Sequence, residues 1–172
     1  MDQSFIIAIL SPILLTIGGI FTWVIKSKRE ETLNVEEKAR EFKIETYRKL
    51  LEPFIAAFTF TLSEEEKNKE VNKLSSLEYR KTVIDLNTFG SDESISIFNK
   101  IMQTFYHDDD YYVEGKLSDE YTLRLLALIS ELLLQIRRDL YSKKTRLIRS
   151  DLIEFMLKDI DDYKAKINTY SY

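Results

Sequence analysis

A long uncharged segment near the start of the chain constrains every other inference. Residues 5–25 read FIIAILSPILLTIGGIFTWVI and carry no charged side chain. At about 1.5 Å of rise per residue, a helix of this length crosses a hydrocarbon core of about 30 Å. A cleavable signal peptide would need a basic start and a small-residue cleavage site, and the chain starts Met-Asp-Gln-Ser. The sequence predicts a transmembrane anchor over residues 1–25.

The charges beside this segment predict its orientation. Lys26, Lys28 and Arg29 follow it directly, whereas Asp2 is the one charged side chain before it. Basic residues stay on the cytoplasmic side of a membrane, so we expect the N-terminus outside the cell. Residues 26–33 then form a basic juxtamembrane segment, and residues 34–172 a cytoplasmic domain.

Small residues recur along one face of the apolar segment. In lipid, such a face lets two helix backbones approach closely, and this predicts self-association. The alternative is that small residues are simply common in transmembrane helices. The tentative positions for this contact are Ala8, Ser11, Gly18 and Thr22.

Composition excludes several large classes of enzyme and binding protein. The chain has no cysteine, one histidine and four glycines, and no nucleophile, nucleotide or metalloprotease motif is found. Residues 26–172 hold 25 basic and 28 acidic side chains, a net charge of −3, which gives no general attraction to nucleic acid. We therefore expect no enzymatic activity, no cofactor and no catalytic residue.

Helix signals dominate the cytoplasmic part, and they predict an all-α bundle of about four to five helices. Serine followed by acidic residues caps a helix start, because the hydroxyl accepts from an exposed amide and the acids complement the helix dipole. This signature recurs at Ser63, Ser91 and Ser118, and Ser150 resembles it. The expected helices cover residues 63–87, 91–106, 118–141 and 150–167, with Gly90 ending the first.

An earlier helix is expected to start near Asn34, with Pro53 causing a kink or a restart. The alternative is that residues 26–33 continue the membrane helix directly. An apolar stripe on this helix indicates a face toward the bundle; it comprises Val35, Ala39, Phe42, Leu50, Phe54 and Phe58.

The segment from Ser118 to Tyr141 is apolar on nearly all sides and is predicted to be the central helix. Its charged residues, Arg124 and Glu131 among them, leave charge-free runs too short for a second membrane span.

Two polar segments are candidate sites. The run His107–Asp110 offers oxygen and imidazole ligands, but it lacks the spacing of a calcium loop, so a solvated turn is expected and no metal is assigned. The second segment carries six cations within 13 residues, which suit an anionic lipid or a phosphorylated ligand. The competing interpretation is structural, because cations stabilise a helix C-terminus and pair with acids. The six are Arg137, Arg138, Lys143, Lys144, Arg146 and Arg149.

Three stretches resemble a diffuse group of uncharacterised small bacterial proteins with one N-terminal membrane helix. The resemblance rests on YRKLLEPFI from Tyr47, FGSDESISIFNK from Phe89 and LLLQIRRDLYSKKTRLIRSDLIEFMLKDI from Leu132. It covers residues 40–163, and Tyr141 stands where the group has glycine. It implies a bacterial helical domain and supplies no site residue. With the predicted anchor, the expected location is the bacterial inner membrane.

These observations favour a non-enzymatic, single-pass membrane protein whose cytoplasmic bundle binds a protein partner or receives a signal. The alternative is an oligomerising effector that perturbs the membrane, for example in phage defence. A hydrolase using His107 and the adjacent aspartates is the third and weakest hypothesis.

Overall fold

The computed structural model describes residues 3–57, 62–113, 116–141, 145–157 and 159–171. Within these ranges it does not describe the side chains of residues 3–20, 57, 64, 113 and 116–117. The chain divides into two units, Met1–Phe42 and Lys43–Tyr172. The expected all-α fold is confirmed, with one short antiparallel strand pair added, β1 (Tyr112–Val113) and β2 (Lys116–Leu117).

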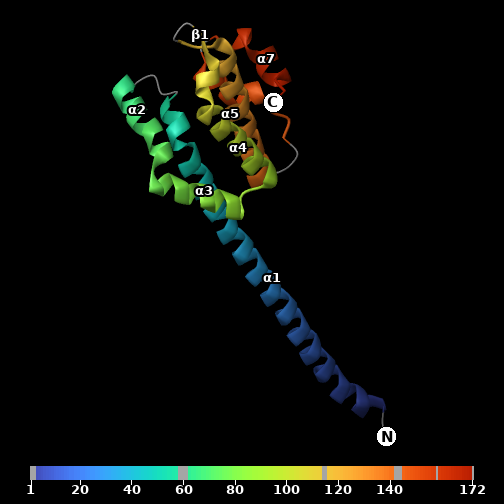
Figure 1. Ribbon diagram of the computed structural model, residues 1–172. Coiled ribbons are helices and arrows are strands. Elements are labelled where there is room, and N and C mark those ends of the chain that lie inside the picture. The colour runs from blue at the N-terminus through green and yellow to red at the C-terminus, as the bar shows by residue number, and fades with distance from the viewer. Residues whose placement is uncertain (1–2, 58–61, 114–115, 142–144, 158, 172) are drawn as a thin grey trace. The chain divides into compact units, whose positions relative to one another are not determined.

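The first helix, α1, is continuous over Gln3–Ala57 (Figure 1). The expected helix start near Asn34 is therefore wrong, and the alternative of direct continuation is confirmed. The helix also continues past Pro53, so no restart occurs there. Of the predicted apolar stripe, Leu50 and Phe54 are buried, whereas Val35 is 63% exposed, which overturns the expectation that it faces a bundle. Phe58 lies outside the described residues.

Serine caps begin the next helices as expected. Ser63 forms a capping box with Glu66 at the start of α2 (Glu64–Asn72), and Ser91 accepts from the backbone of Ser94 at the start of α4 (Asp92–Tyr106). Ser118 accepts from the backbone of Tyr121, with 3.2 Å between N and Oγ, at the start of α5 (Asp119–Leu140).

The expected single helix over residues 63–87 is broken. A 3₁₀ turn, η1 (Lys73–Ser75), follows α2, and α3 (Leu77–Phe89) starts afresh. Ser76 explains the break, because its extended backbone leaves the helical conformation and its hydroxyl accepts from the amide of Tyr79 at 3.1 Å. Gly90 ends α3 as expected.

The expected helix over residues 150–167 is also broken, into α6 (Arg149–Ile153), the 3₁₀ turns η3 (Glu154–Met156) and η4 (Ile160–Asp162), and α7 (Lys164–Thr169). Two hydrogen bonds join Ser150 to Asn168, at 3.0 and 3.1 Å. An unbroken helix between these positions would hold them about 27 Å apart. The chain must therefore turn back for the two ends to meet.

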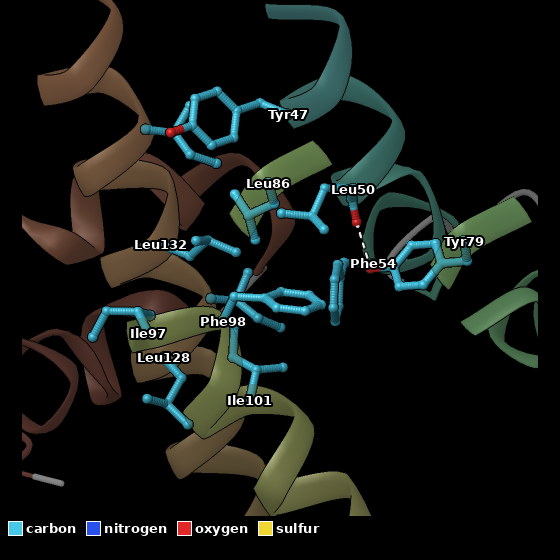
Figure 2. Close-up of a cluster of buried hydrophobic side chains, with 12 residues drawn as sticks. Tyr47, Leu50, Phe54, Tyr79, Leu86, Ile97, Phe98, Ile101, Leu128 and Leu132 are labelled. Atoms are coloured by element: carbon cyan, nitrogen blue, oxygen red, sulfur yellow. Dashed lines mark hydrogen bonds between the residues drawn. The ribbon is translucent and has the colours of Figure 1, made fainter. Parts of the chain in front are cut away.

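The helix α5 is central to the unit Lys43–Tyr172, as expected. It contacts α4, α6 and α7, and Figure 1 shows α4 beside it. Figure 2 shows the larger buried cluster, in which Leu128 and Leu132 of α5 meet Phe98 of α4 and Leu50 of α1. Tyr79 donates to the carbonyl of Leu50 at 2.9 Å, so its buried hydroxyl has a partner. Ile153, Met156, Ile160 and Ile167 form a second cluster with Leu126.

Candidate ligand groove beside the basic segment

The cations of the basic segment lie in different surroundings. Arg137 and Arg138 occupy the last turn of α5, Arg146 is exposed in the extended stretch before α6, and Arg149 is the first residue of α6. Lys143 and Lys144 lie outside the described residues. The structure therefore locates four of the six predicted cations, and these four differ in the residues that they contact.

Arg149 is part of the fold. Its Nε pairs with Oε2 of the buried Glu131, and one terminal nitrogen donates to the carbonyls of Ile167 at 3.3 Å and Tyr170 at 2.9 Å. A guanidinium suits this task because it presents several donors in one plane. Arg149 thereby ties the start of α6 to α5 and to the C-terminal stretch.

Glu131 has further partners on its own helix. Gln135 donates to Oε1 of Glu131, and a terminal nitrogen of Arg138 lies 4.0 Å from the same oxygen. Glu131 itself is 7% exposed, and a carboxylate so buried needs such partners because desolvation of a charge is costly. Among the described residues, Arg149 and Arg138 are the cations within salt-bridge distance of Glu131, and Arg149 is the closer one.

Arg137 differs from both. It is exposed, and no described carboxylate lies within salt-bridge distance of it. It lies at a groove whose other described lining residues are apolar or aromatic. The groove has a volume of about 280 Å³ and is lined, besides Arg137, by Leu51, Phe54, Ile55, Ile129, Leu133, Ile136, Leu140, Tyr141, Leu152, Phe155 and Met156.

Three elements form this groove, which we call the Arg137 groove. The end of α1 supplies one part of the lining, the C-terminal half of α5 another, and α6 with η3 the rest. Three of its apolar side chains are strongly exposed: Ile55 at 50%, Tyr141 at 65% and Phe155 at 80%. Exposed apolar side chains that gather around one hollow are typical of a binding surface, whereas scattered ones are not.

A polar network fixes the relative position of α1 and α5 beside the groove. Asp139 accepts from the hydroxyl of Tyr47 at 2.6 Å and from Nζ of Lys43 at 3.0 and 3.1 Å. The amide of Ser91 donates to the Tyr47 hydroxyl at 3.4 Å. Burial, together with the hydrogen bond to Asp139, raises the pKa of Tyr47 above its ordinary value of 10.0. The network joins all three sequence stretches that carry the resemblance.

A larger hollow elsewhere in the fold has mixed walls. It measures about 710 Å³ and lies between η1 and α3 on one side and α4 on the other. Apolar residues such as Met102 line it together with Asn72, Asn99, Gln103 and Arg80. This mixture selects no single class of ligand, whereas the Arg137 groove combines one charge with an apolar wall.

The His107–Asp110 run forms the expected turn. Asp108–Tyr111 make a 3₁₀ turn, η2, and Nδ1 of His107 lies 2.9 Å from the carbonyl oxygen of Gln103. Among the residues that the structure describes, no three His, Asp or Glu side chains gather in a way that would hold a metal ion.

The predicted membrane contact lies mostly beyond the described side chains. Ala8, Ser11 and Gly18 fall within residues 3–20, of which the structure gives the helical backbone only, and Thr22 is exposed. Where side chains are described, no helix is long and apolar enough to cross a membrane.

Comparisons with protein-family models, with curated proteins and with solved structures find no match to this chain.

The sequence alone did not indicate the Arg137 groove. Arg137 and Arg138 are neighbours in the last turn of α5, but they lie on different faces of the helix. Arg137 lines the groove, and Arg138 lies near Glu131. One signal was available: Ile129, Leu133, Ile136 and Leu140 repeat at helical spacing around Arg137. Nothing in the sequence indicated that Phe155 lines the groove, because its exposure depends on how the chain reverses direction within residues 149–170.

Proposed function

We propose that this chain is a membrane-anchored, non-enzymatic helical module that receives a signal at the cytoplasmic face of a bacterial inner membrane. The Arg137 groove is the observation that carries the receiving role. It is a hollow with three exposed apolar side chains and a cation that has no described acidic partner. Such a surface is suited to binding and supplies no nucleophile or general base.

The membrane anchor is supported by the sequence of residues 5–25, which has no charge over 21 residues. Cysteine labelling of intact cells tests both anchor and orientation. A membrane-impermeant reagent should label a Gln3→Cys variant from outside and leave a Ser171→Cys variant unlabelled. The reverse pattern would contradict the cytoplasmic location of the bundle.

The receiving role is tested with a photo-reactive amino acid at Phe155 in the full chain, irradiated in cells. Phe155 is 80% exposed, so the replacement should not disturb the fold. We expect a discrete cross-linked species. The matched control places the same amino acid at Leu77, which is 73% exposed and lies outside the groove. Equal adducts at both positions, or none at Phe155, would contradict a specific receiving surface.

A further inference from the structure

We propose that the Arg137 groove binds a free single-chain amphiphile with one anionic head, of the medium-chain fatty carboxylate class. This inference rests on the proposed receiving function and names its ligand. Three features of the groove carry it: the chemistry of its lining, its size, and the state of its one charged residue.

The lining specifies a ligand with one apolar body. Among the described groove residues, every side chain except that of Arg137 is aliphatic, aromatic or a thioether, and Tyr141 contributes the one hydroxyl of this set. A ligand with polar groups along its length would lose their hydration without gaining partners here. Sugars, nucleotides and polar peptides are disfavoured for this reason.

The volume limits the size of that body. A cavity of about 150 Å³ holds one benzene molecule. By the same ratio, the groove, at about 280 Å³, holds an apolar body of roughly ten carbon atoms within its walls. This matches a medium-length acyl chain.

Arg137 specifies the head. None of the described residues that line the groove is acidic, and none of the described carboxylates lies within 4.0 Å of Arg137. A guanidinium at the edge of an apolar hollow can donate two parallel hydrogen bonds to a carboxylate while the acyl chain of the ligand covers the apolar wall. The neighbouring Arg138 lies toward Glu131, so Arg137 is the one cation among the described lining residues, and one anionic group matches it.

The experiment uses the full chain in lipid nanodiscs and decanoate carrying a photo-reactive diazirine. After irradiation, mass spectrometry of the peptides measures labelling in the groove relative to labelling of residues 5–25. The second region reports unspecific partition of the probe into lipid. We expect labelling of residues 129–141 and 152–156 that excess decanoate displaces and decanol of equal chain length displaces less.

Matched variants separate the head from the chain. Arg137→Gln should weaken decanoate binding about threefold to fivefold, the upper end of the range for an exposed ion pair. Phe155→Ala should weaken the binding of decanoate and decanol alike, because it removes a wall shared by both. Arg146→Gln and Leu77→Ala should change neither, since both residues are exposed and lie outside the groove.

Two results would overturn the inference, and they are distinguishable from failure of the proposed function. Groove labelling no higher than that of residues 5–25 would exclude the amphiphile. Equal displacement by decanoate and decanol, unchanged in Arg137→Gln, would exclude the anionic head. A cross-link from position 155 to a protein, with no decanoate labelling, would leave the receiving function standing and replace the ligand by a protein partner.

Discussion

Arg137 and Arg149 belong to one basic segment, yet the structure gives them opposite surroundings. Arg149 has a buried carboxylate and two carbonyls as partners, whereas Arg137 lies at an apolar groove and has no described carboxylate within 4.0 Å. A run of cations in a sequence therefore does not define one site. The difference comes from Glu131 of α5, because a buried carboxylate needs a cation nearby to offset the cost of its desolvation. Arg149 lies next to Glu131, and Arg137 does not.

The largest expected effect tests the buried helix that supports both arginines. Leu128→Asp places a charge at a position with no exposure, and an unpaired buried charge costs several kcal/mol, comparable with the roughly 5–15 kcal/mol of total stability. We expect the near-ultraviolet circular dichroism of the folded unit to be lost. Leu77→Asp, at an exposed position on α3, serves as control. Wild-type melting of the Leu128→Asp chain would mean that α5 is not the central helix.

The next prediction tests whether Glu131 is the reason that Arg149 and Arg137 have different surroundings. Glu131→Gln leaves Arg149 half-buried without a counter-charge, and the free energy of unfolding should fall by about 3 kcal/mol. Chemical denaturation measures this fall. Glu154→Gln, which alters an exposed pair with Lys164, should lower stability by no more than about 1 kcal/mol. Equal losses in the two variants would refute a structural role for Glu131.

A smaller effect is expected at the network beside the groove. Tyr47→Phe removes one of the hydrogen bonds to Asp139 while Lys43 remains, and should lower stability by about 1–2 kcal/mol. The same variant has a pH signature. The pKa of Tyr47 is raised in the folded state, so its contribution is complete below pH 10 and is lost as the pH rises through the folded value. The wild type should therefore lose part of its advantage over Tyr47→Phe above pH 10, as followed by unfolding at pH 8 and at higher pH.

A similar loss of stability at alkaline pH is expected from Tyr121, at the start of α5. Burial, together with the nearby Asp108, raises its pKa to about 12. Its stabilisation is then present below pH 10 and lost between about pH 10 and 12. Tyr121→Phe should make the stability of the chain less dependent on pH across this interval. A variant with an unchanged pH profile would show that the phenol titrates normally.

The smallest effect concerns the groove itself. Phe155→Ala should change the free energy of unfolding by no more than about 0.5 kcal/mol, because the side chain is 80% exposed and contributes little to the core. Differential scanning calorimetry detects such a shift. A loss of 2 kcal/mol or more would identify Phe155 as a structural residue and remove it from the binding surface.

Local sequence signals predicted the start of helices, and the contacts between distant residues decided where helices break. The serine and acidic residues at Ser63, Ser91 and Ser118 act within four residues, so they could be recognised directly. Ser76 also caps a helix, but it follows Ser75 in a continuous polar stretch that looks helical. The turn back of residues 149–170 depends on Ser150 meeting Asn168, a contact that no local pattern encodes.

The candidate site was predictable only in part, because local sequence patterns indicate some of its residues and contacts between distant residues place the others. The charge density around Arg137 marked the region, and helical spacing marked Leu133 and Leu140 as apolar neighbours. The division of the cations was not predictable, because Glu131 and Arg149 are 18 residues apart and meet only when α6 packs on α5. The groove needs the end of α1 as well, which is further still along the chain.

The most direct measurement compares Arg137→Gln with Arg149→Gln in one denaturation experiment on the full chain. Arg149→Gln should lower the free energy of unfolding by about 3 kcal/mol, because the buried Glu131 loses its closest cation. Arg137→Gln should stay within about 0.5 kcal/mol of the wild type. Equal destabilisation by the two substitutions would contradict the division of the basic segment into a structural arginine and a ligand-facing one.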